Sequence, residues 1–355
     1  MEILFSLLKI IIFPMLVISL IPLLIWMERK VSAYIQDRRG PNRASIFGVR
    51  LWGMIHNIAD VIKLLTKEDI IPAGANKFYF VLAPAILMFV SFVAVAVIPF
   101  ADSVYWEEGQ VISMQLADLD VGLLYILAIS SLAVYSIMLA GWSSNNKYSF
   151  LGGLRASSQM ISYEIAMGLS VVALFMISGS VGLNEIVRDQ GPLPWHWNFF
   201  RQPLAFFVFL AASYAETNRT PFDLPEGESE IVAGYHVEYS SMKFAMFFMG
   251  EYAAMVIASA VAASLFLGGW QVPFLSTENL RSMAPVFLHP SFFAAVLQMT
   301  TFLAKILFFC FLFVWVRWTL PRFRYDQLMS FGWRVMLPLA LLNILATGGF
   351  MIAWY

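Results

Sequence analysis

The chain has 355 residues, of which 60% are hydrophobic and 13% are charged, and its formal net charge is −1. Because about a quarter of the residues of a soluble domain are charged, this composition predicts an integral membrane protein, and the near-zero net charge gives no reason to expect nucleic-acid binding. The single cysteine, Cys310, excludes a disulfide framework, a four-cysteine zinc site and an iron–sulfur cluster built by this chain alone.

The apolar runs predict the fold class. A membrane-spanning helix needs about 20 predominantly apolar residues, and the chain has eight such runs, of which the fifth is short. They cover residues 3–26, 78–99, 120–142, 160–180, 203–215, 242–268, 292–316 and 334–355. The first is too long for the apolar part of a cleavable signal. We therefore predict an all-α polytopic membrane protein with eight transmembrane helices in a single domain, residues 1–355.

The basic residues predict how these helices are oriented. Loop 27–77 and the later connections on the same side together hold 17 of the 22 lysines and arginines. By the positive-inside rule this side is cytoplasmic, which places both termini on the periplasmic side. The opposite loop, 100–119, has four carboxylates and no basic residue, in agreement with this orientation.

Residues 46–68 differ from the spans because polar and apolar side chains alternate at helical intervals. Asp60 and Lys63 belong to the polar set, and Ile55, Ile58 and Ile62 belong to the apolar set. This pattern predicts an amphipathic helix on the cytoplasmic interface. It is either an ordinary interfacial anchor or one wall of an opening through which a lipophilic ligand enters from the bilayer.

Segment 215–241 is the most unusual part of the chain because it carries six carboxylates next to two apolar runs. They are Glu216, Asp223, Glu226, Glu228, Glu230 and Glu238, with Arg219 as the basic residue among them. Pro225 is well placed to begin a short helix, with acidic residues in its first turn. We expect a bent loop with an acidic helix that is a proton-handling site, a docking surface or both, rather than only a solvated loop helix.

Ionisable side chains also occur within the predicted spans, where they are costly and therefore candidates for function. They are Glu164 in the fourth span, Glu216 at the end of the fifth, Glu251 in the sixth and Lys305 in the seventh. One interpretation of Lys305 and Glu251 is a structural ion pair between neighbouring spans. The other is a series of protonatable groups that, bridged by water, conducts protons.

Five stretches resemble a known family. They are ERKVSAYIQDRRGPNR (28–43), ADVIKLLTKE (59–68), SSQMISYEI (157–165), AETNRTPFDLPEGESEIVAGYHVEYSSMKFAMFFMGEY (215–252) and PRFRYDQLMSFGWRVMLPLALLN (321–343). Their order and sequence are similar to those of the H subunit of NADH:quinone oxidoreductase, respiratory complex I. The outer loops 100–119, 181–202 and 269–290 match less well, and Gly227 stands where relatives often have alanine.

The resemblance implies a membrane subunit that forms a quinone chamber with the peripheral arm. It implies chamber residues Arg29, Arg38, Arg43, Asp60, Lys63, Phe222, Glu226 and Glu230, and a proton path of Glu164, Glu216, Glu226, Glu228, Glu230 and Glu251, to which the charge pattern adds Lys305. Quinone is then a diffusible substrate, reduced by an iron–sulfur cluster of a neighbouring subunit, and this chain alone binds no cofactor or metal and has no catalytic residue. The implied partners are other complex I subunits and membrane lipid, in a bacterial inner membrane.

Two protons accompany the two-electron reduction of a quinone, and a chamber lined with carboxylates can respond by a change in their protonation, which is our hypothesis for coupling. Three alternatives stay open. The first is the related membrane subunit of a ferredoxin- or deazaflavin-driven dehydrogenase or hydrogenase. The second is a free-standing proton-coupled transporter, and the third is a purely structural anchor. The sequence specifies neither the quinone type nor the proton stoichiometry.

Overall fold

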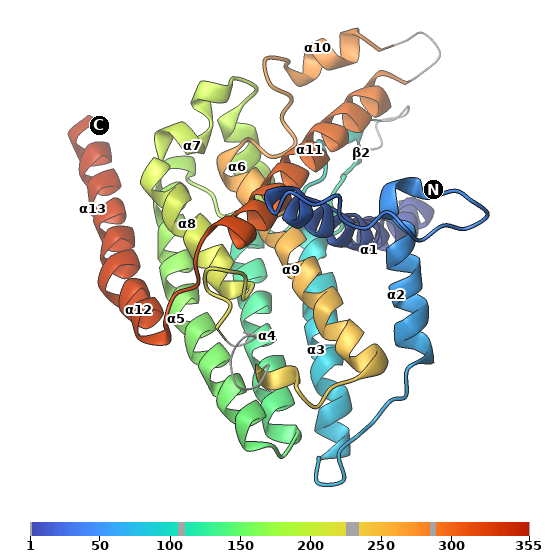
Figure 1. Cartoon of the computed structure of the whole chain (residues 1–355). Coiled ribbons are helices and arrows are strands. Elements are labelled where there is room, and N and C mark those ends of the chain that lie inside the picture. The colour runs from blue at the N-terminus through green and yellow to red at the C-terminus, as the bar shows by residue number, and fades with distance from the viewer. Residues whose placement is uncertain (1, 106–110, 225–233, 285–288, 355) are drawn as a thin grey trace.

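The computed structural model describes residues 2–105, 111–224, 234–284 and 289–354, and the helices are arranged as one bundle (Figure 1). The long helices are α1 (Glu2–Ile35), α3 (Lys77–Ala94), α4 (Gly122–Ser143), α5 (Lys147–Ser178), α8 (Pro203–Glu216), α9 (Ser241–Phe266), α11 (Pro290–Thr319) and α13 (Leu337–Trp354). Shorter helices are α2 (Ile55–Thr66), α6 (Leu183–Gln190), α7 (Asn198–Arg201), α10 (Thr277–Ser282) and α12 (Tyr325–Phe331). Strands β1 (Val104–Tyr105) and β2 (Val111–Ile112) form a two-stranded antiparallel ribbon. The predicted all-α class is confirmed.

The count of eight transmembrane helices is not confirmed. In the described part of the chain, seven helices are long and apolar enough to cross a membrane, and the last of them joins α12 to α13 through a π-helical turn at Gly332–Met336. The fifth predicted span is α8, whose 14 residues extend only about 21 Å. It is short because the chain breaks at Gln202, which has a φ of −137°. The helix by itself therefore covers only about 21 Å of a hydrocarbon layer of about 30 Å, while Asn198 before it contacts Leu265 of α9 and Arg219 after it contacts Glu28 of α1.

Helix α9 lies at the centre of the bundle, and α2 and α13 stand at opposite edges (Figure 1). Of the seven candidate spans, α9 has the largest buried share, 61%, whereas the first and last spans have 22%. α9 is rich in alanine, and such small side chains let neighbouring helices approach closely. In a membrane this close packing drives helix association, because the hydrophobic effect does not act between helices surrounded by lipid. The side chains of the first and last spans are therefore left to contact lipid or other proteins.

Helix α5 begins 13 residues before the predicted start of the fourth span, residue 160. The added turns are polar but contain Gly152 and Gly153, which allow close backbone contacts. A Cβ atom on Gly152 would lie 2.7 Å from the Cα atom of Gly234, and one on Gly153 would lie 3.5 Å from the Cα atom of Gly141 in α4. Packing against neighbouring backbone thus extends the helix where hydropathy alone predicts a loop.

The amphipathic helix is shorter than predicted. Residues 55–66 form α2, whereas residues 46–54 form a β-bridge and a 3-10 turn. The helix cannot extend further back because Gly48 and Gly53 have φ values of +82° and +96°, a region that right-handed helices do not use. Ile58, Ile62 and Leu65 on α2 are at least half exposed. This apolar face is therefore available to lipid, as the amphipathic pattern predicts.

Replacing Gly152 by alanine is expected to weaken the contact between α5 and residues 234–235 of the acidic segment. The new methyl group would meet backbone atoms of Gly234 and Tyr235 at 2.7–2.9 Å, and such overpacking costs about 1–3 kcal/mol. The matched control is Gly168→Ala on the same helix, because no atom of the described residues lies within 4 Å of its Cβ position. Thermal unfolding of the purified protein should show a lower transition only for G152A, and equal transitions would contradict the close contact.

Candidate functional site

The acidic segment begins with a tight turn that is held from α5. After α8 ends at Glu216, Asn218 takes a φ of +48°, and the N–H group of Arg219 donates to the carbonyl of Tyr214 at 3.0 Å. The buried amide of Gln159 donates to the carbonyls of Ala215 and Phe222 at 2.9 and 2.8 Å. One side chain of α5 thereby fixes both ends of the turn and directs Arg219 into the bundle.

Arg219 joins a buried ion cluster that contains Glu28, Tyr252 and Arg317. Its Nη1 atom lies 3.2 Å from Oε2 of Glu28, and its guanidinium carbon is 4.4 Å from the centroid of the Tyr252 ring. Glu28 also accepts from the hydroxyl of Tyr252 at 2.7 Å and from Nη1 of Arg317 at 2.5 Å. The cluster therefore joins α1, the turn after α8, α9 and α11 through one carboxylate.

The cluster carries a net positive charge, since two guanidinium groups share one carboxylate. Burial would lower the pKa of Arg219, but the Glu28 carboxylate outweighs burial and raises this pKa, so Arg219 stays charged. Its Nε and Nη2 atoms are buried without a hydrogen-bond partner in the described ranges of the chain. Buried polar groups are normally satisfied, so these donors are free to bind an oxygen atom from outside the described residues.

Asp223 forms a second buried pair four residues further on. Its Oδ2 atom lies 3.1 Å from Nη2 of Arg322. Burial raises the pKa of Asp223 to about 6, against the opposing effect of the Arg322 and Arg317 guanidinium groups, and the charge of Glu251 adds to the rise. Asp223 therefore changes its protonation in a pH range where an ordinary aspartate stays ionised.

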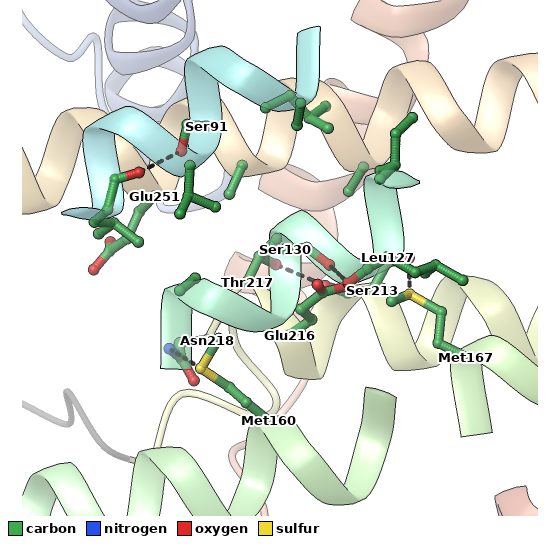
Figure 2. Close-up of a pocket in the computed structure, with 18 of the residues that line it drawn as sticks. Ser91, Leu127, Ser130, Met160, Met167, Ser213, Glu216, Thr217, Asn218 and Glu251 are labelled. Carbon is green, nitrogen blue, oxygen red and sulfur yellow. Dashed lines mark hydrogen bonds between the residues drawn. The ribbon is translucent and has the colours of Figure 1, made fainter. Parts of the chain in front are cut away.

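A partly open cavity lies between α3, α4, α5, α8 and α9, and two carboxylates reach its wall. Figure 2 shows Glu216 among Ser130, Ser213 and Thr217, with Glu251 apart from them. The cavity leaves about 80 Å³ for the centres of water molecules. Since one water needs roughly 10–15 Å³ of such space, several waters can fit between apolar side chains and these polar groups.

Glu251 connects the ion cluster with the cavity. It precedes Tyr252 on α9, lines the cavity, and accepts a hydrogen bond from the hydroxyl of Tyr235 at 3.0 Å. Its charge also acts on Arg219 and Asp223. A change of charge at the cluster therefore changes the electrostatic energy of the Glu251 carboxylate in the cavity wall.

The residues predicted for the chamber fall into separate groups. Arg29 pairs with Asp60 at 2.7 Å, which links α1 to α2 at a partly exposed position. Arg38 and Arg43 line, with Arg29, Arg39 and Arg50, a basic pocket of about 720 Å³ at the end of α1. The side chain of Lys63 is exposed on α2.

Phe222 is buried, 5.2 Å from the ring of Tyr163 between ring centroids. Among the predicted proton-path residues, Glu164 is half-buried and near enough to Glu216 for their charges to interact. Glu226, Glu228 and Glu230, together with the predicted acidic helix, lie outside the described residues.

Lys305 does not pair with Glu251. Its Nζ atom donates to the carbonyls of Leu267, Gly269 and Gln271, just past the end of α9 that is far from the acidic segment. Glu251 is 15 residues before Phe266, the last residue of α9, so about 23 Å separates the two regions along the helix. The interpretation of these residues as an ion pair between neighbouring spans is therefore wrong.

Sequence reasoning does not find the ion cluster as a unit. In the sequence, Arg219 is only the basic residue within the acidic segment, Glu28 follows the first apolar run, and Arg317 is one of the residues that indicate orientation. One sequence signal for the cluster is Glu28, a carboxylate that directly follows an apolar run in a helix that continues to Ile35. A charge in such a position needs a partner of opposite charge. Only the tertiary fold shows which partners it finds.

Comparison with known proteins identifies the family. A family model described as NADH dehydrogenase matches residues 8–348. An H subunit of the NADH-quinone oxidoreductase of Cytophaga hutchinsonii is 50% identical over 322 residues, covering 90% of this chain and 89% of the relative. The chain belongs to the H-subunit family of the NADH-quinone oxidoreductases. An H subunit from Koribacter versatilis is 44% identical, with 98% and 96% covered, and subunit 8 of the Rhodothermus marinus enzyme is 49% identical, with 91% and 90% covered.

Family membership confirms the resemblance seen in the sequence motifs. The relatives are named as subunits of an oxidoreductase, so none of them is a complete enzyme by itself. Together with the seven long apolar helices of the described ranges, this identifies the chain as a multi-pass membrane protein of a bacterial type.

Removing the Glu28 carboxylate is expected to destabilise the fold strongly. In Glu28→Ala, Arg219 and Arg317 lose their shared partner, and an uncompensated buried charge costs about 3–5 kcal/mol. The control is Asp326→Asn, which breaks the exposed Arg324–Asp326 pair and should change stability by less than about 1 kcal/mol. Thermal unfolding of the purified complex measures both variants, and a similar small effect from both would show that the cluster does not stabilise the fold.

Asp223 is expected to give stability a distinct pH dependence. Because its pKa rises from 3.8 to about 6 on folding, its stabilising contribution is complete below about pH 4 and is lost as the pH rises through about 6. Wild-type stability minus that of Asp223→Asn should therefore fall by up to about 3 kcal/mol between pH 4 and 7. Unfolding curves at several pH values test this, and parallel pH profiles of the two proteins would contradict it.

Proposed function

We propose that this chain is the membrane subunit of a proton-pumping NADH:quinone oxidoreductase that forms the quinone chamber and couples quinone reduction to proton movement. The observation that carries the proposal is the position of the buried cluster around Glu28 and Arg219 next to a cavity lined by Glu216 and Glu251. Family membership supplies the reaction, and the geometry supplies a way for the membrane subunit to respond to it.

The cluster is chemically suited to the head of a quinone. The described residues place three buried or half-buried guanidinium groups, those of Arg219, Arg317 and Arg322, against the carboxylates of Glu28 and Asp223. Unpartnered donors on Arg219 can bind a quinone oxygen, and the excess positive charge favours a reduced form that carries negative charge. In this proposal electrons arrive from an iron–sulfur cluster of a neighbouring subunit, because the single cysteine of this chain cannot hold such a cluster by itself.

The exposed face of α2 supports a route for the quinone from the bilayer. Its apolar side chains face away from the bundle, and the Arg29–Asp60 pair holds α2 against α1. The basic pocket of Arg38 and Arg43 lies at the same end of α1. We assign these residues and Lys63 to the chamber mouth and to the contact with the peripheral arm, on the cytoplasmic side, with both termini periplasmic.

Coupling follows from proton balance. A quinone becomes a quinol by taking up two electrons and two protons, and each electron added before its proton leaves negative charge at the head. This charge acts on Asp223 and Glu251, and through Glu251 on Glu216 and the cavity that both glutamates line. Glu164 extends this set within the membrane, and the family resemblance adds Glu226, Glu228 and Glu230, which lie outside the described residues. The neighbouring membrane subunits of the complex then receive the change.

Replacing Glu216 by glutamine in the assembled complex tests the coupling. The substitution keeps the size of the side chain but removes its ability to exchange a proton, and we expect coupled proton pumping to fall by about tenfold or more. The control is Glu278→Gln, which removes an equal charge from the exposed helix α10. Acidification by proteoliposomes oxidising NADH measures the effect, and wild-type pumping by E216Q would refute the role of this cavity.

A further inference from the structure

The ammonium group of Lys305 is fixed at the end of α9 by three backbone carbonyls. The Nζ atom lies 2.7 Å from the oxygen of Leu267 and 2.8 Å from those of Gly269 and Gln271. Three acceptors match the three N–H groups of a protonated lysine, whereas a neutral amine has only two. The ring of Trp197 covers the ammonium at 4.5 Å, a cation–π contact. The geometry is therefore that of a charged lysine saturated with acceptors.

Buried amide side chains satisfy the adjoining backbone groups in the same way. The Oε1 atom of Gln190 accepts from the N–H of Gly268 at 2.9 Å, and its Nε2 atom donates to the carbonyl of Ser264 at 2.9 Å. Asn198 donates to the carbonyl of Leu265 at 2.9 Å. The end of a helix normally leaves carbonyls for water, but here side chains from α6, α7 and α11 take that place.

This closed helix end lies about one and a half turns beyond the carboxylate cavity. The last α9 residue that lines the cavity is Val261. Leu265 and Phe266 follow and are fully buried, and the ring of Phe209 lies 5.5 Å from that of Phe266. The cavity is thus followed first by an apolar layer and then by a fixed positive charge.

We propose that Lys305 is a positioning residue that closes the carboxylate cavity against proton leakage at the far end of α9. The ammonium holds three carbonyls that would otherwise need water, and its charge repels a hydrated proton that approaches from that side, as fixed cations do in other proton-excluding pores. Protons that reach Glu216 must then leave toward neighbouring subunits. This inference rests on the proposed function of the cavity and removes Lys305 from the set of proton carriers.

The decisive variant is Lys305→Met, which keeps the length of the stem and removes the charge and donors. The assembled complex is reconstituted into proteoliposomes, and the decay of an imposed pH difference is followed without NADH. We expect decay several times faster than for wild type, with quinone reduction close to wild type. A proton carrier would instead lose pumping without any leak, and that result would overturn the proposal.

Two further variants separate this proposal from a general loss of structure. In the double variant K305M with E216Q the leak should fall back toward wild type, because the leak passes through the cavity; an undiminished leak would contradict the proposal. The variant Gly269→Ala retains the lysine. Because residue 269 has a φ of +46° and the new Cβ atom would lie 2.6 Å from Val187, the backbone must shift and displace the carbonyl that Lys305 binds. We therefore expect a proton leak in this variant as well.

The control for the glycine variant is Gly349→Ala on α13, which should not leak, because in the described part of the chain no atom lies within 4 Å of the Cβ position. If Lys305→Met fails to assemble, Gly269→Ala decides the matter by the same measurement, and an assembled, leak-free G269A complex would overturn the proposal. Because the leak is measured without turnover, it is independent of whether E216Q still pumps. Normal pumping by E216Q would contradict the proposed function, whereas the absence of a leak in the Lys305 and Gly269 variants would contradict only the proposed role of Lys305.

Discussion

The arrangement of this protein depends on one buried carboxylate that two guanidinium groups share. Glu28 comes from α1, Arg317 from α11, and Arg219 from the turn after α8, while Tyr252 of α9 completes the contact. Each charge would be costly in this environment without the others. The contact therefore forces the start of the acidic segment to lie against three long helices, and it places Glu251, the neighbour of Tyr252, between the cluster and the cavity.

Much of the fold could be predicted from the sequence, because hydropathy identifies long apolar helices directly. The prediction failed where packing or backbone geometry overrides hydropathy. α5 begins early because Gly152 lies against the backbone of Gly234, and α2 begins late because Gly48 and Gly53 have positive φ. Each of these features depends on tertiary contacts or local dihedral angles that apolar periodicity does not encode.

The site could be predicted residue by residue but not as an arrangement. The sequence identifies Glu216, Glu251 and Lys305 as charges within apolar runs, and at that level all three are equivalent. The structure separates them, since the two carboxylates line one cavity and Lys305 binds three carbonyls beyond it. In the proposed mechanism this asymmetry gives direction: charge changes enter from the cluster side, and the opposite end of α9 is closed.

In the proposed function the quinone head lies beside the cluster of Glu28, Arg219 and Arg317. Photo-crosslinking of the assembled complex with a quinone analogue that carries the reactive group on its head, followed by mapping of the labelled peptides, tests this position. We expect label within residues 28–68 or 215–252, and less label when an excess of unmodified quinone competes. Label confined to the lipid-facing sides of the other spans would contradict it.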